Sequence, residues 1–93
     1  MAVLIRTNGK KEEVKPKNGK NFSLEELRTS IGGGWIECLP IPSGIGTIVC
    51  DEEGKLKGLP MNEVATHFMY LCFGISSDYL CGDVLVADDG EID

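Results

Sequence analysis

The opening stretch AVLIRTNGKKEEVK, residues 2–15, decides the first half of the fold. Asn8-Gly9 is the strongest short signal for a β-hairpin, because both residues tolerate the positive φ of a type I′ turn. Before this turn, apolar side chains alternate along a strand. After it, polar residues return as an exposed strand with Val14 pointing inward. Pro16 ends that strand because proline cannot donate to a sheet ladder. The stretch therefore predicts an N-terminal hairpin.

A complete helix start follows the hairpin. Ser23 stands at the N-cap position, and Glu26 three residues later forms a capping box with it. Leu24, Leu27 and Ile31 share one apolar face at helical spacing. Gly32 is the kind of residue that ends a helix at C′. We therefore expect a short helix over residues 24–31.

The remaining residues predict three or four further strands and a second helix. The turn at 51–54 can be followed by a short fourth strand at 55–57. Asn62 can cap the second helix, and Gly74 ends it. The other three strands are expected over residues 35–41, 46–50 and 82–87. The apolar stripe of the second helix is expected to consist of Val64, Phe68, Leu71 and Cys72, with Ala65 alongside.

The resulting order is β-β-α-β-β-(β)-α-β in a single small domain spanning residues 1–93. This order predicts an α+β fold with a mixed sheet of about five or six strands and two helices packed on one face. A β-grasp-like arrangement is one such solution.

Charge is distributed unevenly along the 93 residues, whose net charge is -6. Residues 1–20 hold six bases and two acids, a balance of +4, and the rest hold three bases and thirteen acids, a balance of -10. A protein that binds extended nucleic acid usually has a domain with net positive charge, so proteins that bind extended nucleic acid are excluded. A local basic spot can still meet a small anion or an acidic partner, or the hairpin lysines can simply maintain solubility.

Targeting, metal and cofactor signals are absent. The apolar stretches fall far short of the roughly 18 residues of a membrane span, and the N-terminal residues do not resemble a signal peptide. We therefore expect a soluble cytoplasmic protein. The four cysteines lack zinc-site spacing and are expected to be reduced, buried and hydrophobic in role. No metal or cofactor is predicted. The acids at 51–53 are better explained as a solvated turn than as a cation site.

The segment Lys55-Leu56-Lys57-Gly58-Leu59-Pro60-Met61-Asn62 is the main candidate for a binding site. The free backbone N–H groups of a helix start, together with two nearby lysines, could hold a phosphate or a carboxylate. Alternatively, glycine and proline shape the loop and the asparagine only caps the helix. The predicted ligand-binding residues are Lys55, Lys57, Gly58, Leu59, Pro60, Asn62, Trp35 and His67.

Trp35 and His67 belong to this set for different reasons. Trp35 and Tyr70 offer flat surfaces on which a base could stack, although a lone tryptophan is commonly a core residue. His67, one turn along the second helix, would lie near the loop or pack against the sheet edge. Gly32-Gly33-Gly34 follows a helix, whereas phosphate-binding glycine loops precede one. No nucleophile elbow, Walker motif or catalytic dyad spacing is present, so we predict a non-enzymatic protein.

Four segments in series resemble the family called domain of unknown function 3846. They are Gly33-Gly34-Trp35-Ile36-Glu37, Val49-Cys50-Asp51-Glu52-Glu53-Gly54-Lys55, Gly58-Leu59-Pro60-Met61-Asn62 and Gly82-Asp83-Val84-Leu85-Val86. The similarity covers nearly the whole chain. The glycine-leucine-proline-x-asparagine loop is a family hallmark. Trp35 stands where the family commonly has tyrosine, and the stretch from His67 to Cys81 departs most from the family pattern.

The resemblance implies a protein encoded by phages, prophages or plasmids of bacteria, with no catalytic residues to carry over. A host-interaction, counter-defence role is the resulting expectation. One form sequesters a small anionic ligand, such as an immune-signalling nucleotide, in an oligomer. The alternative form is an anti-CRISPR or anti-restriction type inhibitor that binds a host defence protein through its acidic surface. A phage accessory structural protein is the third option. No membrane partner is expected.

Overall fold

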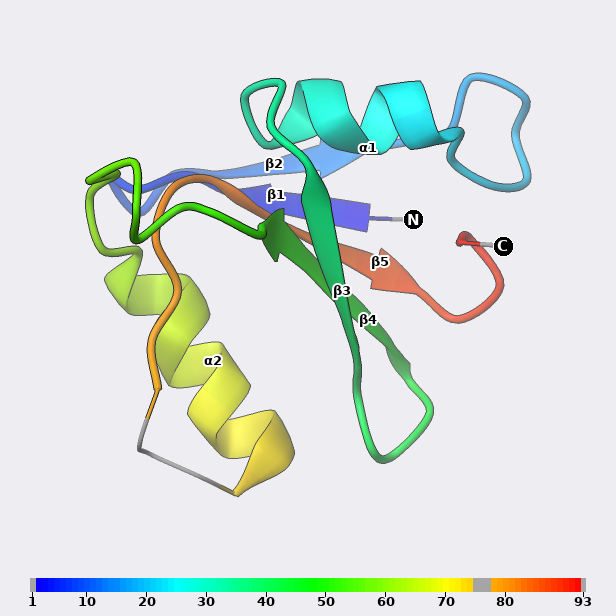
Figure 1. The fold of residues 1–93 in the computed structure, drawn as a ribbon. Coiled ribbons are helices and arrows are strands. Elements are labelled where there is room, and N and C mark those ends of the chain that lie inside the picture. Colours follow the sequence, from blue (N-terminus) through cyan, green and yellow to red (C-terminus); the bar gives the residue numbers. More distant parts are fainter. Residues whose placement is uncertain (1, 75–77, 93) are drawn as a thin grey trace.

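A computed structural model describes residues 2–74 and 78–92 (Figure 1). Within them a five-stranded sheet has the order β2-β1-β5-β4-β3, and neighbouring strands pair antiparallel throughout. The strands are β1 (Ala2–Ile5), β2 (Lys11–Val14), β3 (Ile36–Pro40), β4 (Gly46–Asp51) and β5 (Val84–Asp88), and the helices are α1 (Leu24–Ser30) and α2 (Glu63–Phe73).

The predicted α+β class, the two helices and the element order are confirmed, and the structure adds two specifics. The sheet is antiparallel rather than mixed, so it lacks the parallel central pair of a β-grasp arrangement. Residues 55–57 form turns instead of the optional strand. The antiparallel pairing of β4 and β5 follows from the path of α2. Because Asn62 N donates to Leu80 O at 2.8 Å and Gly82 N donates to Pro60 O at 2.8 Å, the chain returns beside the start of α2 before β5 begins.

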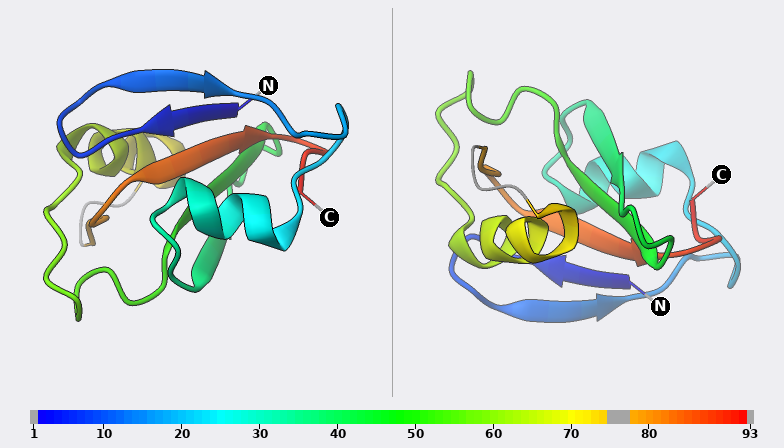
Figure 2. Two further views of the ribbon diagram at one scale, coloured as in Figure 1. Left: turned by 90° about the horizontal axis from the view of Figure 1, so that it is seen from above. Right: turned by 90° about the horizontal axis from the view of Figure 1, so that it is seen from below.

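The two helices cover opposite faces of the sheet, so the expectation that both pack on one face was wrong (Figure 2). The core cluster under α1 contains Val49 and Leu85, whereas the cluster under α2 contains Ile48 and Val84. All four side chains are fully buried. Consecutive strand residues point to opposite faces, so two such pairs require an apolar cover on both sides.

Both helix caps form as predicted. Ser23 Oγ accepts from Glu26 N at 3.1 Å and Glu26 Oε1 accepts from Ser23 N at 3.0 Å, which completes the capping box of α1. Asn62 Oδ1 accepts from Ala65 N at 3.1 Å at the start of α2. Gly74 ends α2 in the left-handed conformation with φ of 69°. Glycine is favoured there because other residues are strained at positive φ.

The buried stripe of α2 differs from the predicted one. Ala65, Thr66 and Met69 are its buried residues, and the predicted Phe68 and Cys72 pack partly buried against the same cluster. The prediction was wrong for Leu71, which is 72% exposed, and for Val64, which is also exposed. Thr66 is drawn inward because its Oγ1 accepts from Leu80 N at 2.9 Å. Five residues along an α-helix turn the side-chain direction by about 140°, so Leu71 lies away from Thr66 and faces solvent.

On the apolar face predicted for the first helix, Leu27 and Ile31 are buried as predicted, whereas Leu24 is 54% exposed. No helix in the described ranges has the length and hydrophobicity needed to cross a bilayer.

Candidate functional site

Lys57 lies beside the end of β4 and is engaged by a carboxylate of its own chain. Its Nζ is 2.8 Å from Oδ2 of Asp51, whose side chain is almost fully buried. Oδ1 of Asp51 accepts from Glu53 N at 2.8 Å. A Cβ on Gly34 would meet the Asp51 carboxylate and would lie 2.6 Å from Lys57 Nζ, so only glycine leaves room for this ion pair. The pair is therefore built into the fold.

The Asp51 pKa predicts a stability change in acid. Burial would raise this pKa, but the hydrogen bonds from Lys57 and Glu53 N and the lysine charge more than offset it, so the pKa lies below the ordinary 3.8. A lowered folded-state pKa contributes stability that is present above the unfolded pKa and lost as pH falls through the folded value. We expect the free energy of unfolding of Asp51→Asn to fall less than that of the wild type between pH 5 and pH 2. Urea titrations across this range would measure it, and equal pH slopes would contradict it.

Lys55 is also paired within the chain. Its Nζ forms an ion pair with Oδ1 of Asp78 and lies 4.3 Å from the centroid of the Tyr79 ring. The hydrogen bond with Asp78 raises the pKa of Lys55 and lowers that of the aspartate. An anion that binds Lys55 would have to displace Asp78, and one that binds Lys57 would have to displace Asp51. Neither predicted lysine offers an unpaired charge.

The glycine-leucine-proline-x-asparagine loop has a structural role. Asn62 has no exposed surface, and its Nδ2 donates to Ile5 O and Gly82 O, both at 2.9 Å. A Cβ on Gly82 would lie 2.9 Å from Cδ1 of Leu59, so the leucine packs directly on that glycine. Gly58 has φ of 70°. Asn62 therefore cannot touch a ligand, and the loop joins β1, α2 and the approach to β5.

Trp35 and His67 lie at separate places. The Trp35 side chain is 57% exposed, and the Arg28 guanidinium lies 4.3 Å from its ring centroid, so the core interpretation of this tryptophan was wrong. Arg28 also donates to Gly33 O at 2.9 Å and to Gly34 O at 3.2 Å. A Cβ on Gly34 would lie 2.6 Å from Lys57 Nζ, so the backbone that precedes Trp35 passes close to Lys57. His67 is exposed on α2, and its side chain makes no hydrogen bond or ion pair within the described chain.

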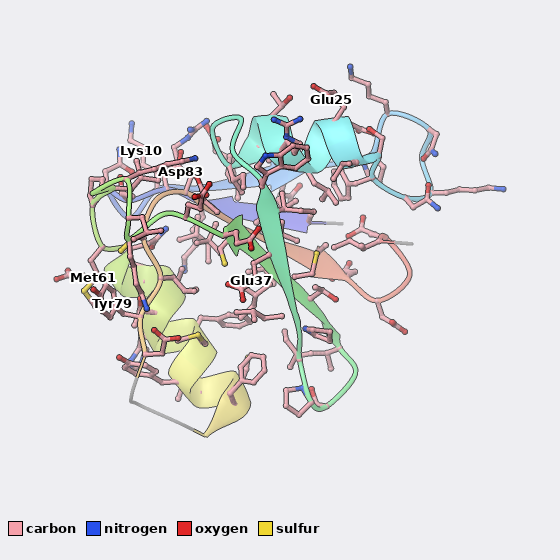
Figure 3. The ribbon with its side chains drawn as sticks, viewed as in Figure 1. Lys10, Glu25, Glu37, Met61, Tyr79 and Asp83 are labelled. Carbon is pink, nitrogen blue, oxygen red and sulfur yellow. The ribbon has the colours of Figure 1, made fainter. Side chains whose placement is uncertain are left out.

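A pocket of about 320 Å³ lies between the β3–β4 end of the sheet and the segment that precedes β5. Figure 3 shows Glu37 on the β3 side and Tyr79 on the other side. Among the predicted site residues only Lys55 lines it. The full lining is Glu37, Leu39, Cys50, Asp51, Glu52, Gly54, Lys55, Leu56, Asp78, Tyr79, Leu80 and Cys81. A pocket of similar volume between β2 and α1 contains none of the predicted residues.

The pocket carries a net negative charge, because two of its acids are neutralised by ion pairs and two are not. Asp51 is engaged by Lys57 and Asp78 by Lys55. Glu37 and Glu52 have no basic partner within the described residues, and both are exposed. Burial and the nearby Glu37 carboxylate raise the pKa of the Cys50 thiol to about 12, so this thiol stays protonated. The pocket therefore favours a cation over an anion.

The cysteines follow the prediction only in part. Cys50 and Cys81 are buried, Cys72 is half-buried and Cys38 is exposed on β3, and all four are free. The expectation of four buried cysteines was wrong for Cys38 because β3 is an edge strand. No group of three potential metal-ligating side chains occurs in the described residues.

The comparison with known families agrees with the resemblance seen in the sequence motifs. The family described as Domain of unknown function (DUF3846) matches residues 1–93. The chain belongs to that family. No curated protein and no solved structure matches it. In this chain the glycine-leucine-proline-x-asparagine loop is accounted for by the contacts of Asn62 and Leu59 within the fold.

Sequence reasoning missed the pocket because its walls are far apart in the chain. Glu37 and Leu39 come from β3, and Tyr79 comes from the return after α2. The available signal was the excess of acids beyond residue 20, which indicates the charge of such a site without locating it.

Proposed function

We propose that this protein is a non-enzymatic host-interaction protein that inhibits a basic host defence component by binding it through an acidic edge. The acidic edge comprises Glu37 and Glu52 together with the pocket between them and Tyr79. The observation that carries the proposal is that these two carboxylates are exposed and have no basic partner in the part of the chain that the structure describes, while both loop lysines are already paired. The phage and plasmid context implied by the family resemblance supports a counter-defence role.

The acidic edge also has the apolar contacts that an interface needs. Leu56 is 85% exposed and Tyr79 is 42% exposed, and both line the pocket. Exposed aromatic side chains frequently dominate binding energy when a partner covers them. Uncompensated carboxylates around them attract a positively charged surface and accelerate its association at low salt. The edge thus combines long-range attraction with short-range packing.

A small anionic ligand is the second candidate, and one observation favours it. Lys55 lies over the Tyr79 ring at the border of the pocket, whose volume falls in the range of small-molecule sites. A base could stack on the tyrosine while its phosphate takes the place of Asp78 on the lysine. This candidate predicts thermal stabilisation by nucleotides that is lost in Lys55→Ala.

The test compares two double variants of equal charge. Tagged wild-type protein is expected to capture a basic protein from lysate of a host bacterium at low salt and release it as salt rises. Glu37→Gln with Glu52→Gln should abolish capture, because it neutralises the acidic edge. Glu13→Gln with Glu25→Gln neutralises two exposed acids elsewhere and should retain it. Equal capture by both double variants would contradict the proposal, and so would wild-type protein that captures nothing at low salt.

A further inference from the structure

The two edges of the sheet differ in how they are protected. β2 forms one edge with an exposed run of charged side chains, Lys11-Glu12-Glu13, which disfavours pairing with another strand. β3 forms the other edge and carries one charge, on Glu37, among Ile36, Cys38, Leu39 and Pro40. The β3 edge therefore lacks the charges that prevent strand addition at β2.

The pairing with β4 determines which backbone groups of β3 are free. Glu52 N donates to Trp35 O and Ile41 N donates to Gly46 O, each at 2.9 Å. Because hydrogen-bonded pairs alternate along an antiparallel ladder, the odd-numbered residues of β3 bond to β4 and the even-numbered ones point outward. The N–H groups of Ile36 and Cys38 have no acceptor among the described residues. They are available to an added strand.

Pro40 occupies the next outward position of β3. Proline has no N–H, so an edge strand accommodates it where the missing donor would face solvent. The carbonyl of Pro40 can still accept. An added strand would therefore meet a short ladder of two donors and three acceptors, contributed by Ile36, Cys38 and Pro40.

Side chains of such a strand would reach the acidic pocket. Leu39 packs with the α2 cluster, and both Glu37 and Leu39 line the pocket, so the odd-numbered side chains of β3 lie on that face. Neighbouring residues of paired strands point to the same face, so every second side chain of an added strand would lie beside Glu37. A basic side chain there would compensate the carboxylates of Glu37 and Glu52.

We propose that the β3 edge binds an extended segment of a partner protein by strand addition, with basic side chains at alternate positions directed to the pocket. The inference rests on the proposed function and specifies its binding mode: main-chain hydrogen bonds provide affinity, and the acidic pocket selects the sequence.

The probe is an acetylated, amidated peptide of alternating arginine and valine, Arg-Val-Arg-Val-Arg-Val-Arg, titrated by calorimetry at low salt. In antiparallel addition, the arrangement used throughout this sheet, arginines directed to the pocket leave the three valine amides facing β3. N-methylation of the valines should therefore weaken binding by about tenfold or more, as expected for the loss of up to three hydrogen bonds. N-methylation of the arginines should be tolerated, because those amides point away from the sheet. Equal effects of the two methylation patterns would overturn strand addition.

A protein variant provides the matching test. Cys38→Pro removes the central outward N–H while leaving the ladder to β4 intact, and it should weaken peptide binding by about tenfold, whereas Cys38→Ser keeps that N–H and should bind normally. Thermal unfolding checks that both variants are folded. If the proline variant does not fold, the two methylated peptides still test strand addition on the wild-type protein. Full binding by a folded Cys38→Pro would also overturn the inference.

The outcomes separate this inference from the proposed function. If both methylated peptides bind fully, and Glu37→Gln with Glu52→Gln abolishes that binding, the acidic edge is retained and strand addition is rejected. If light scattering shows a dimer of the wild type that dissociates in Cys38→Pro, a second copy occupies the β3 edge and the inference is wrong.

Discussion

Asn62→Ala is expected to lower the free energy of unfolding by about 3 to 5 kcal/mol. The substitution removes the cap of α2 and leaves the Ile5 and Gly82 carbonyls without their donor in the interior. A buried unsatisfied polar group costs about 1 to 3 kcal/mol, and a lost N-cap about 1 kcal/mol. Small domains have only about 5 to 15 kcal/mol of stability in total. Urea denaturation followed by circular dichroism would measure the loss.

Ser23→Ala is the matched control for this substitution. Ser23 also caps a helix through its side chain, but it is exposed and its bonds stay within α1. Its loss is expected to cost about 1 kcal/mol. Similar losses for Ser23→Ala and Asn62→Ala would show that the tertiary bonds of Asn62 contribute nothing, and would contradict the structural role assigned to the loop at residues 58–62.

Leu85→Ala is expected to cost about 2 to 5 kcal/mol, the usual range for a buried leucine reduced to alanine. Leu85 is fully buried in the middle strand of the sheet and packs in the cluster under α1. The truncation leaves a cavity between the sheet and α1, which the paired strands β1 and β4 cannot close without distorting their ladders. Thermal and urea unfolding would both report the loss.

Leu56→Ala removes the same atoms from an exposed site and serves as the control. Leu56 is 85% exposed in the turns after β4, so its truncation should change stability by less than about 0.5 kcal/mol. A large loss at Leu56, or a negligible one at Leu85, would contradict the burial of these leucines.

Local signals predicted the parts of the fold whose causes are local. The β1–β2 hairpin, the Ser23 capping box and the Asn62 cap each depend on residues within a few positions, and all three elements formed. The type I′ turn expected at Asn8-Gly9 was wrong, because only Gly9 has positive φ and its N–H donates to Arg6 O, which places the turn at residues 6–9. The placement of the helices was mispredicted because the apolar runs of β4 and β5 do not state which face each helix covers. In each of these strands two consecutive residues are buried, and because such residues point to opposite faces, this pattern was the available evidence that both faces of the sheet are covered.

The candidate site was harder to predict because its electrostatics depend on distant partners. Lys55 is paired with Asp78, 23 residues away, and Trp35 reaches the neighbourhood of Lys57 only through the close approach at Gly34. A sequence shows the lysines without showing that their charges are already compensated. The sequence also does not show that β3 forms an edge of the sheet, and the exposure of Cys38 and Glu37 depends on this edge position.

The position of β5 has a consequence for synthesis in the cell. β5 follows the other four strands in chain order, yet it lies between β1 and β4, where it joins the hairpin of β1 and β2 to the hairpin of β3 and β4. Isolated hairpins are marginally stable in water. During translation these two hairpins therefore remain unconnected until residues 84–88 leave the ribosome, and the sheet then assembles in one late step. A ribosome that stalls before this point releases a chain with no central strand, which we expect proteases to remove instead of a partly active fragment.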